Sequence, residues 1–198
     1  MYTHSSSRKP ILLLMISTFL LFTANAQTRY TSAAVDLTIN GTSTLHDWSM
    51  TSVRAQCEAL FDLNSAGQIT GVRSVSFSTP ANALKSDHTA MDNNAYKALK
   101  AEKDPFISFT ATSINVTPAA GGAATVTVTG KLTIAGMTRD AQIVTLCQPG
   151  SAGNTITVTG KENISMKDFS MAPPTFMLGT IKTGNDVTLS FKLTLKRS

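Results

Sequence analysis

The chain is poor in the residues that most enzymes and nucleic-acid-binding proteins use at their sites. Its 198 residues include 12 Asp and Glu, three His, two Cys and one Trp. No nucleophile–histidine–acid order, glycine-rich phosphate loop or carboxylate pair stands out. Catalysis is therefore disfavoured and no cofactor is expected, although a cleft can assemble residues that are distant in sequence. The 17 Lys and Arg are scattered among the acids without a basic run, which predicts a solvated surface and no nucleic-acid partner.

Cysteine and histidine are too sparse to predict a metal centre. Cys57 and Cys147 both fall on the apolar face of a predicted strand, where two alternatives stay open. They form one structural disulfide in an oxidising compartment, or they are two buried free thiols that act as small hydrophobic groups. His88 has Asp87 and Asp92 near it, but their spacing is not that of a metal site.

The only long apolar run lies at the beginning of the chain. Arg8 and Lys9 precede twelve apolar or small residues at 11–22, and Ala24-Asn25-Ala26 has the small-x-small pattern of a cleavage site. This is the layout of a secretory signal peptide, and the run is too short to span a bilayer comfortably. We predict that residues 1–26 are removed after Ala26. The mature chain, 27–198, is then one exported domain, most simply periplasmic, with no transmembrane segment and an oligomeric state that the sequence leaves open.

What the mature chain has in abundance is alternation of apolar residues with Thr, Ser or Lys. Successive side chains of a strand point to opposite faces, so each such segment has one apolar and one polar face. With one Trp and three Tyr there are too few aromatics for the girdles of an outer-membrane barrel, which favours a soluble barrel or sandwich with its apolar faces inward. The predicted strands are Tyr30–Asn40, Thr44–Leu63, Ile69–Ser78, Phe106–Val116, Thr125–Ile134, Arg139–Cys147, Thr155–Met166 and Asp186–Arg197.

Two irregular features interrupt this pattern. In the second strand the apolar positions change from even to odd numbers, which predicts a bulge near residues 50–53. Residues 86–102 carry Met91, Ala95 and Leu99 at helical spacing, and Asp104-Pro105 ends the segment. This helical insertion is predicted to pack across one end of the strands. Gly130 and Gly160 end similar Thr-rich segments and are predicted at bends of the sheet.

Four motifs in order resemble one known family. Ser43-Thr44-Leu45-His46-Asp47-Trp48 is similar to the S-x-L-H-x-W stretch of the YceI-like proteins, and Gly130–Arg139 is similar to their G-x-L-T-I-x-G-x-T-R. Pro105–Phe109 after the helical segment and Asp168-Phe169 followed by Pro173-Pro174 also fit. The resemblance covers about residues 30–196. It implies an extended, lipocalin-like, eight-stranded antiparallel β-barrel with a helical insertion and an apolar pocket for a long-chain amphiphile, of the polyisoprenoid or fatty-acid amide type.

Alternation and this resemblance together predict which residues line such a pocket. The predicted lining residues are His46, Trp48, Val53, Phe61, Phe77, Met91, Leu99, Val128, Leu132, Ile143, Val158, Phe176, Leu189 and Phe191. Arg139 or Lys85 is proposed to meet a charged head group, on charge alone. His46 is read as a buried histidine bonded to backbone or, alternatively, as a polar contact to the ligand. Trp48 is read as core or as a ligand-stacking ring.

Two functions from different classes remain open from the sequence. The first is a carrier that holds an isoprenoid or fatty-acyl chain, because eight strands leave room for one slender ligand. The second is a structural or stress-response barrel whose core is filled by its own side chains and which acts through protein–protein contacts. An enzyme acting on a lipid is a weaker third.

Overall fold

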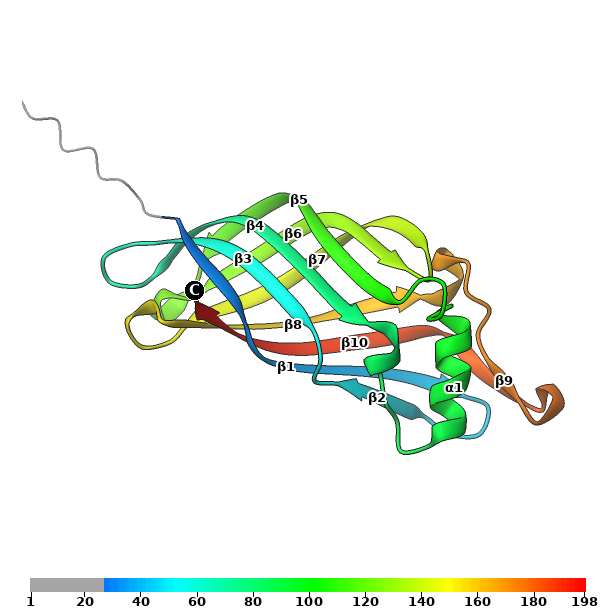
Figure 1. Ribbon diagram of the computed structural model, residues 1–198. Helices are drawn as coiled ribbons and strands as arrows, with labels where there is room; N and C mark the ends of the chain where they lie inside the picture. Colours follow the sequence, from blue (N-terminus) through cyan, green and yellow to red (C-terminus); the bar gives the residue numbers. More distant parts are fainter. Residues whose placement is uncertain (1–26) are drawn as a thin grey trace, which may run out of the picture.

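Ten β-strands and one α-helix form the regular structure of the described residues (Figure 1). The computed structural model describes residues 27–198, so the predicted signal peptide and its cleavage site lie outside them. The helix α1 spans Thr89–Ala98. The strands are β1 Thr28–Ser43, β2 Trp48–Ser52, β3 Gln56–Leu63, β4 Ile69–Pro80, β5 Phe106–Pro118, β6 Ala124–Ile134, β7 Met137–Pro149, β8 Thr155–Ser165, β9 Thr175–Phe176 and β10 Ile181–Arg197.

The sheet closes into a barrel because β1 and β10 pair along almost their whole length. Their antiparallel register runs from Tyr30–Arg197 to Ser43–Thr183. From β3 to β8 each strand pairs with the next, β8 pairs with β10, and β1 pairs with β3. The result is a closed, eight-stranded antiparallel barrel with one helix, which confirms the predicted fold class. In this barrel β2 and β3 pair with successive parts of β1 and together count as one strand. β9 is a two-residue strand that pairs with β10.

The second predicted strand is interrupted instead of bulged. β2 and β3 both pair with β1, and Leu37–Ser52 and Thr28–Phe61 belong to the same register, so no residue is inserted relative to β1. Between them, residues 53–55 leave the ladder. The change of inward-facing positions is nevertheless real, since Met50 is buried on β2 and Cys57 is buried on β3. β1 changes in the same way opposite the break, from the buried Tyr30 to the buried Leu37, and its register with β10 shifts between Ser32 and Ala34.

The two ends of the barrel differ. At the end where the chain emerges from residue 27, Tyr30 and Phe61 pack edge to face, with ring centroids 5.4 Å apart, and the Tyr30 hydroxyl donates to the carbonyl of Gly153. Ile156 and Leu195 are also fully buried there. At the opposite end, α1 and the β9 segment lie beside the strand ends (Figure 1). We call these the packed end and the mouth.

Candidate functional site

A cavity of about 500 Å³ occupies the interior between the packed end and the mouth. Its volume lies within the range of about 300–1,000 Å³ that small-molecule pockets span. Every strand contributes to its wall, and nearly all of the wall is carbon. The alternation of β10 shows how the sequence builds it, because Val187, Leu189, Phe191, Leu193 and Leu195 all line the cavity while the Thr, Ser and Lys between them face outward.

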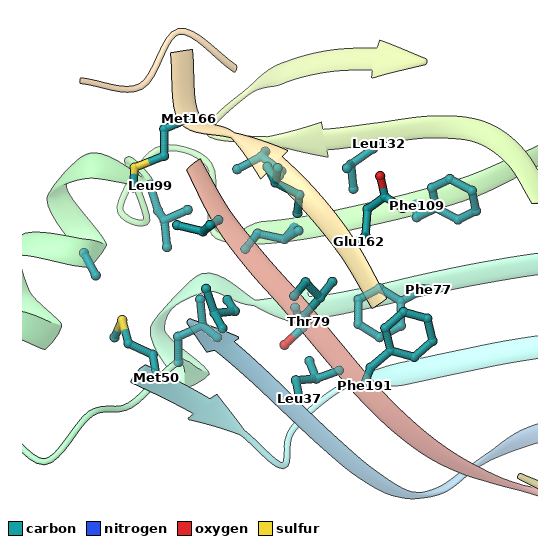
Figure 2. A pocket seen from close by; sticks show the side chains of 18 of the residues that line it. Leu37, Met50, Phe77, Thr79, Leu99, Phe109, Leu132, Glu162, Met166 and Phe191 are labelled. Carbon is teal, nitrogen blue, oxygen red and sulfur yellow. The ribbon is translucent and has the colours of Figure 1, made fainter. Parts of the chain in front are cut away.

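The structure places thirteen of the fourteen predicted lining residues on this wall. They are His46, Trp48, Phe61, Phe77, Met91, Leu99, Val128, Leu132, Ile143, Val158, Phe176, Leu189 and Phe191. Figure 2 shows Phe77, Phe109 and Phe191 with their rings directed into the space. Phe109 and Met50 belong to the wall and were not among the predicted residues.

Val53 is the predicted residue that does not line the cavity. Its side chain is 76% exposed, because residues 53–55 leave the ladder between β2 and β3. The sequence argument assumed that alternation ran through this segment, and the interruption turns Val53 outward. The prediction for Val53 is therefore wrong.

The helix α1 covers part of the mouth with its apolar side. The predicted stripe lines the cavity, with Met91 and Ala95 on α1 and Leu99 directly after its last residue. Two side chains hold the helix in place. Tyr96 donates a hydrogen bond to the carbonyl of Leu84 (2.7 Å), and the buried carboxylate of Asp92 accepts two hydrogen bonds from Ser86.

Asp92 ties α1 to the segment that precedes it. Its Oδ1 accepts hydrogen bonds from the backbone N–H and the hydroxyl of Ser86, each at 2.7 Å, and Lys85 Nζ lies 3.6 Å from Oδ2. Burial acts to raise the pKa of Asp92, but the bonds from Ser86 and the Lys85 ammonium outweigh it and leave this pKa below its ordinary value. Asp92 is therefore an anchor for the helix.

Polar groups occur at the mouth. His46 and His88 both line this part of the cavity. The prediction of a buried His46 is wrong, because residues 44–47 form an exposed loop between β1 and β2 instead of a strand. The predicted backbone contact exists: His46 Nδ1 lies 2.7 Å from the carbonyl oxygen of Asp47. Trp48 is half-buried on the wall, and its indole N–H donates to the carbonyl of Thr42 (3.0 Å).

The two basic residues proposed for a head group lie outside the cavity. Arg139 Nε donates to the carbonyl of Asp168 (2.8 Å). Lys85 pairs with Asp92 and lies 5.1 Å from the centre of the Tyr96 ring. Neither is part of the cavity wall. Both side chains have partners on the outside of the barrel. The sign of their charge does not reveal these partners, so charge alone could not predict that the two residues lie outside the cavity.

Cys57 and Cys147 are both buried free thiols on the cavity wall. Of the two alternatives, the structure shows the thiols and not the disulfide. Cys57 lies on β3 and Cys147 on β7, with three strands of the barrel between them. Burial raises the pKa of Cys57 to about 12 and that of Cys147 to about 11. Both groups are therefore protonated and act as small apolar side chains.

Sequence reasoning missed one charged residue on the wall. Glu162 lies on β8 in phase with the inward-facing Val158 and Ile164. Acidic residues had been assigned to loops and polar faces. The signal that identifies Glu162 is its spacing: it is an even number of residues from Val158 and from Ile164, so all three lie on the same face of the strand.

Among residues 27–198, no three His, Cys, Asp or Glu side chains come close enough to hold a metal ion. Within the same range, no helix has the length and apolar character needed to cross a membrane.

Comparison with known proteins gives one family and several similar folds. The model of the YceI-like domain matches residues 46–195, well over half of the chain. No curated protein matches the sequence. Among solved structures, Burkholderia cenocepacia BcnA is 16% identical, with a TM-score of 0.63, over 81% of this chain and 95% of its own.

Two other solved structures share the fold. A polyisoprenoid-binding domain from Saccharophagus degradans, described as implicated in plant cell wall breakdown, is 13% identical with a TM-score of 0.64, over 87% of this chain and 100% of its own. The YceI protein of Campylobacter jejuni is 19% identical with a TM-score of 0.52, over 72% of this chain and 81% of its own. At these identities the likeness concerns the fold.

Proposed function

The chain belongs to the YceI-like family, and we propose that it is a non-catalytic carrier that holds the apolar chain of an amphiphile inside its barrel. The proposed ligands are of the polyisoprenoid or fatty-acyl type. The observation that carries this proposal is the apolar cavity of about 500 Å³ with polar groups at its mouth. The solved domain from Saccharophagus degradans, whose fold is similar, is described as polyisoprenoid-binding.

The chemistry of the wall supports the binding of a hydrocarbon. Each methylene transferred from water contributes about 0.8 kcal/mol, and association costs at least about 4 kcal/mol of lost translational and rotational freedom. A ligand must therefore bury at least about five methylenes before binding is favourable. This favours long acyl or prenyl chains over small apolar molecules.

The same wall gives little support to a catalytic role. Its two thiols have raised pKa values and are protonated at neutral pH. The hydroxyls of Thr79 and Thr145 donate to the backbone carbonyls of Arg54 (2.7 Å) and Val126 (3.2 Å). These groups satisfy the barrel's own hydrogen bonds and are not arranged as a nucleophile with a base.

A barrel filled by its own side chains, the second reading of the sequence, would not leave a cavity of this size. The two functions are separated by native mass spectrometry of the protein purified from its own host. A co-purifying lipid of defined mass is expected for the carrier. Spectra without lipid, together with no thermal stabilisation by added prenyl or acyl lipids, would contradict it.

We also propose that the carrier acts after export, in the periplasm. The support is the basic, apolar and small-x-small pattern of residues 1–26. The intact mass of the protein from its own host tests it. The expected mass is that of a chain beginning at Gln27, and a mass that includes residues 1–26 would contradict export by this route.

A further inference from the structure

Within residues 27–198, Glu162 is the only Asp, Glu, Lys or Arg that lines the cavity. Its strand neighbour on β10 is Leu189. On the other side, the pairing of β7 with β8 ends at Thr145–Gly160, so Glu162 lies two residues beyond the last pair. Figure 2 shows its carboxyl group among the apolar side chains of the pocket.

The carboxyl group of Glu162 has no partner within residues 27–198, because neither a hydrogen bond nor an ion pair joins it to any of them. Two hydroxyl groups of the wall differ in this respect. Thr79 and Thr145 are bonded to backbone carbonyls. Glu162 alone presents an unused charged acceptor to whatever enters the cavity.

The position of Glu162 along β8 divides the cavity. It lies six residues from Ile156 at the packed end, roughly 20 Å along the strand at about 3.3 Å per residue. Ser165, where β8 ends at the mouth, is three residues further, roughly 10 Å away. The cavity wall extends along β8 from Glu162 to Val158, roughly 13 Å towards the packed end. An apolar tail therefore points in that direction, and the polar end of such a ligand would lie at the level of Glu162.

A ligand in this position removes water from the carboxyl group. Burial already raises the pKa of Glu162. An anionic head at the same depth adds charge repulsion, and a head without a donor leaves the acceptor unpaired. An ammonium or hydroxyl head avoids both costs, because it donates a hydrogen bond to the carboxylate.

We propose that Glu162 is a ligand-selecting subsite, which accepts a hydrogen bond from the amine or hydroxyl head of a long-chain amphiphile and rejects carboxylate and phosphate heads. This inference rests on the proposed carrier function. It names a class of ligand, chains with a hydrogen-bond-donating head. Such a ligand enters tail first, with the tail towards Ile156 and the head on Glu162.

The test uses probes that share one chain and differ in the head: hexadecylamine, hexadecanol and palmitate. Dissociation constants are measured for the lipid-stripped mature protein and for Glu162→Gln and Glu162→Leu. Lys161→Gln is the matched control, since Lys161 is the exposed neighbour on the outer face of the same strand. Both Glu162 variants are expected to fold, because they remove an unpartnered charge from an apolar wall.

For the wild type and Lys161→Gln we expect hexadecylamine and hexadecanol to bind more tightly than palmitate. In Glu162→Gln the ratio of amine to palmitate affinity should fall about tenfold or more, the size of a hydrogen bond to a charged group. In Glu162→Leu palmitate should bind more tightly than it does to the wild type. An unchanged ratio in both variants, with all probes binding, would overturn the subsite alone. A wild type that binds none of the probes would overturn the carrier function as well.

Discussion

The ring of Phe191 on β10 lies directly over the α-carbon of Gly160 on β8, where a β-carbon would overlap the ring. Phe109 on β5 lies in the same way over Gly130 on β6, and a β-carbon there would be 2.6 Å from Cζ of the ring. Both rings belong to the cavity wall. The two Thr-rich segments that end in Gly therefore leave room for an aromatic ring against the sheet at each of these positions.

Gly160→Ala is expected to push the Phe191 ring into the cavity. The overlap should lower the free energy of unfolding by about 1–3 kcal/mol, as overpacking does. Urea denaturation measures this cost. Phe191→Ala and the variant that carries both substitutions complete a double-mutant cycle. The destabilisation caused by Gly160→Ala should largely disappear in this cycle once the Phe191 ring is absent. An equal penalty with and without the ring would show that Phe191 is not the cause.

The two wall thiols are expected to react slowly with iodoacetamide in the folded protein. For a pKa of about 11 to 12, roughly one thiol in a thousand or fewer is ionised at pH 8, against about a quarter for a free cysteine. The rate should rise as the pH approaches these values. Mass spectrometry of the alkylated protein measures the rate, with the urea-unfolded chain as control. Labelling of the folded protein as fast as that of the unfolded chain would contradict the buried, protonated state.

Asp92→Ala is expected to loosen α1, because it removes the acceptor of both Ser86 bonds and the partner of Lys85. The free energy of unfolding should fall by about 1–3 kcal/mol. Hydrogen exchange in residues 89–98 should accelerate more than exchange in the barrel strands. Asp87→Ala, which removes an exposed acid from the same segment, is the matched control and should change neither quantity. Equal effects of the two substitutions would show that Asp92 is not an anchor.

The same anchor predicts a pH dependence with a defined sign. The pKa of Asp92 is lower in the folded protein than its ordinary value, so the folded state favours the carboxylate. Its contribution to stability is complete above the ordinary Asp value of about 4 and is lost as the pH falls through the lower folded value. The protection of α1 against exchange, relative to the intrinsic rate at each pH, should therefore fall below about pH 4 in the wild type and respond less in Asp92→Ala. The same pH response in both proteins would contradict this assignment.

Period-two alternation was sufficient to predict the strands and most of the cavity wall, because each wall residue follows from the parity of its strand. It failed where the parity was broken or misread. Val53 belongs to a three-residue interruption that no local pattern marks, and His46 belongs to a loop that reads as a continuing strand. Glu162 was missed for a different reason. Its spacing along the strand predicts an inward position, but its charge led to its assignment to the polar outer face. The partners of Arg139 and Lys85 depend on segments packed from elsewhere in the chain, which the sequence alone does not bring together.

Two adjacent residues of β7 offer the most direct test of the carrier account. Ile143 lines the cavity, and Val144 is 50% exposed on the outer face. Tryptophan at position 143 occupies space that a ligand chain needs, whereas tryptophan at position 144 leaves the interior unchanged.

The measurement is the affinity of the lipid-stripped protein for a long prenyl or acyl probe. The account predicts that Val144→Trp binds as the wild type does and that Ile143→Trp binds at least about tenfold more weakly, a loss of about 1.4 kcal/mol. Undiminished binding by Ile143→Trp, with both variants folded, would contradict the claim that the chain of the ligand lies inside the barrel.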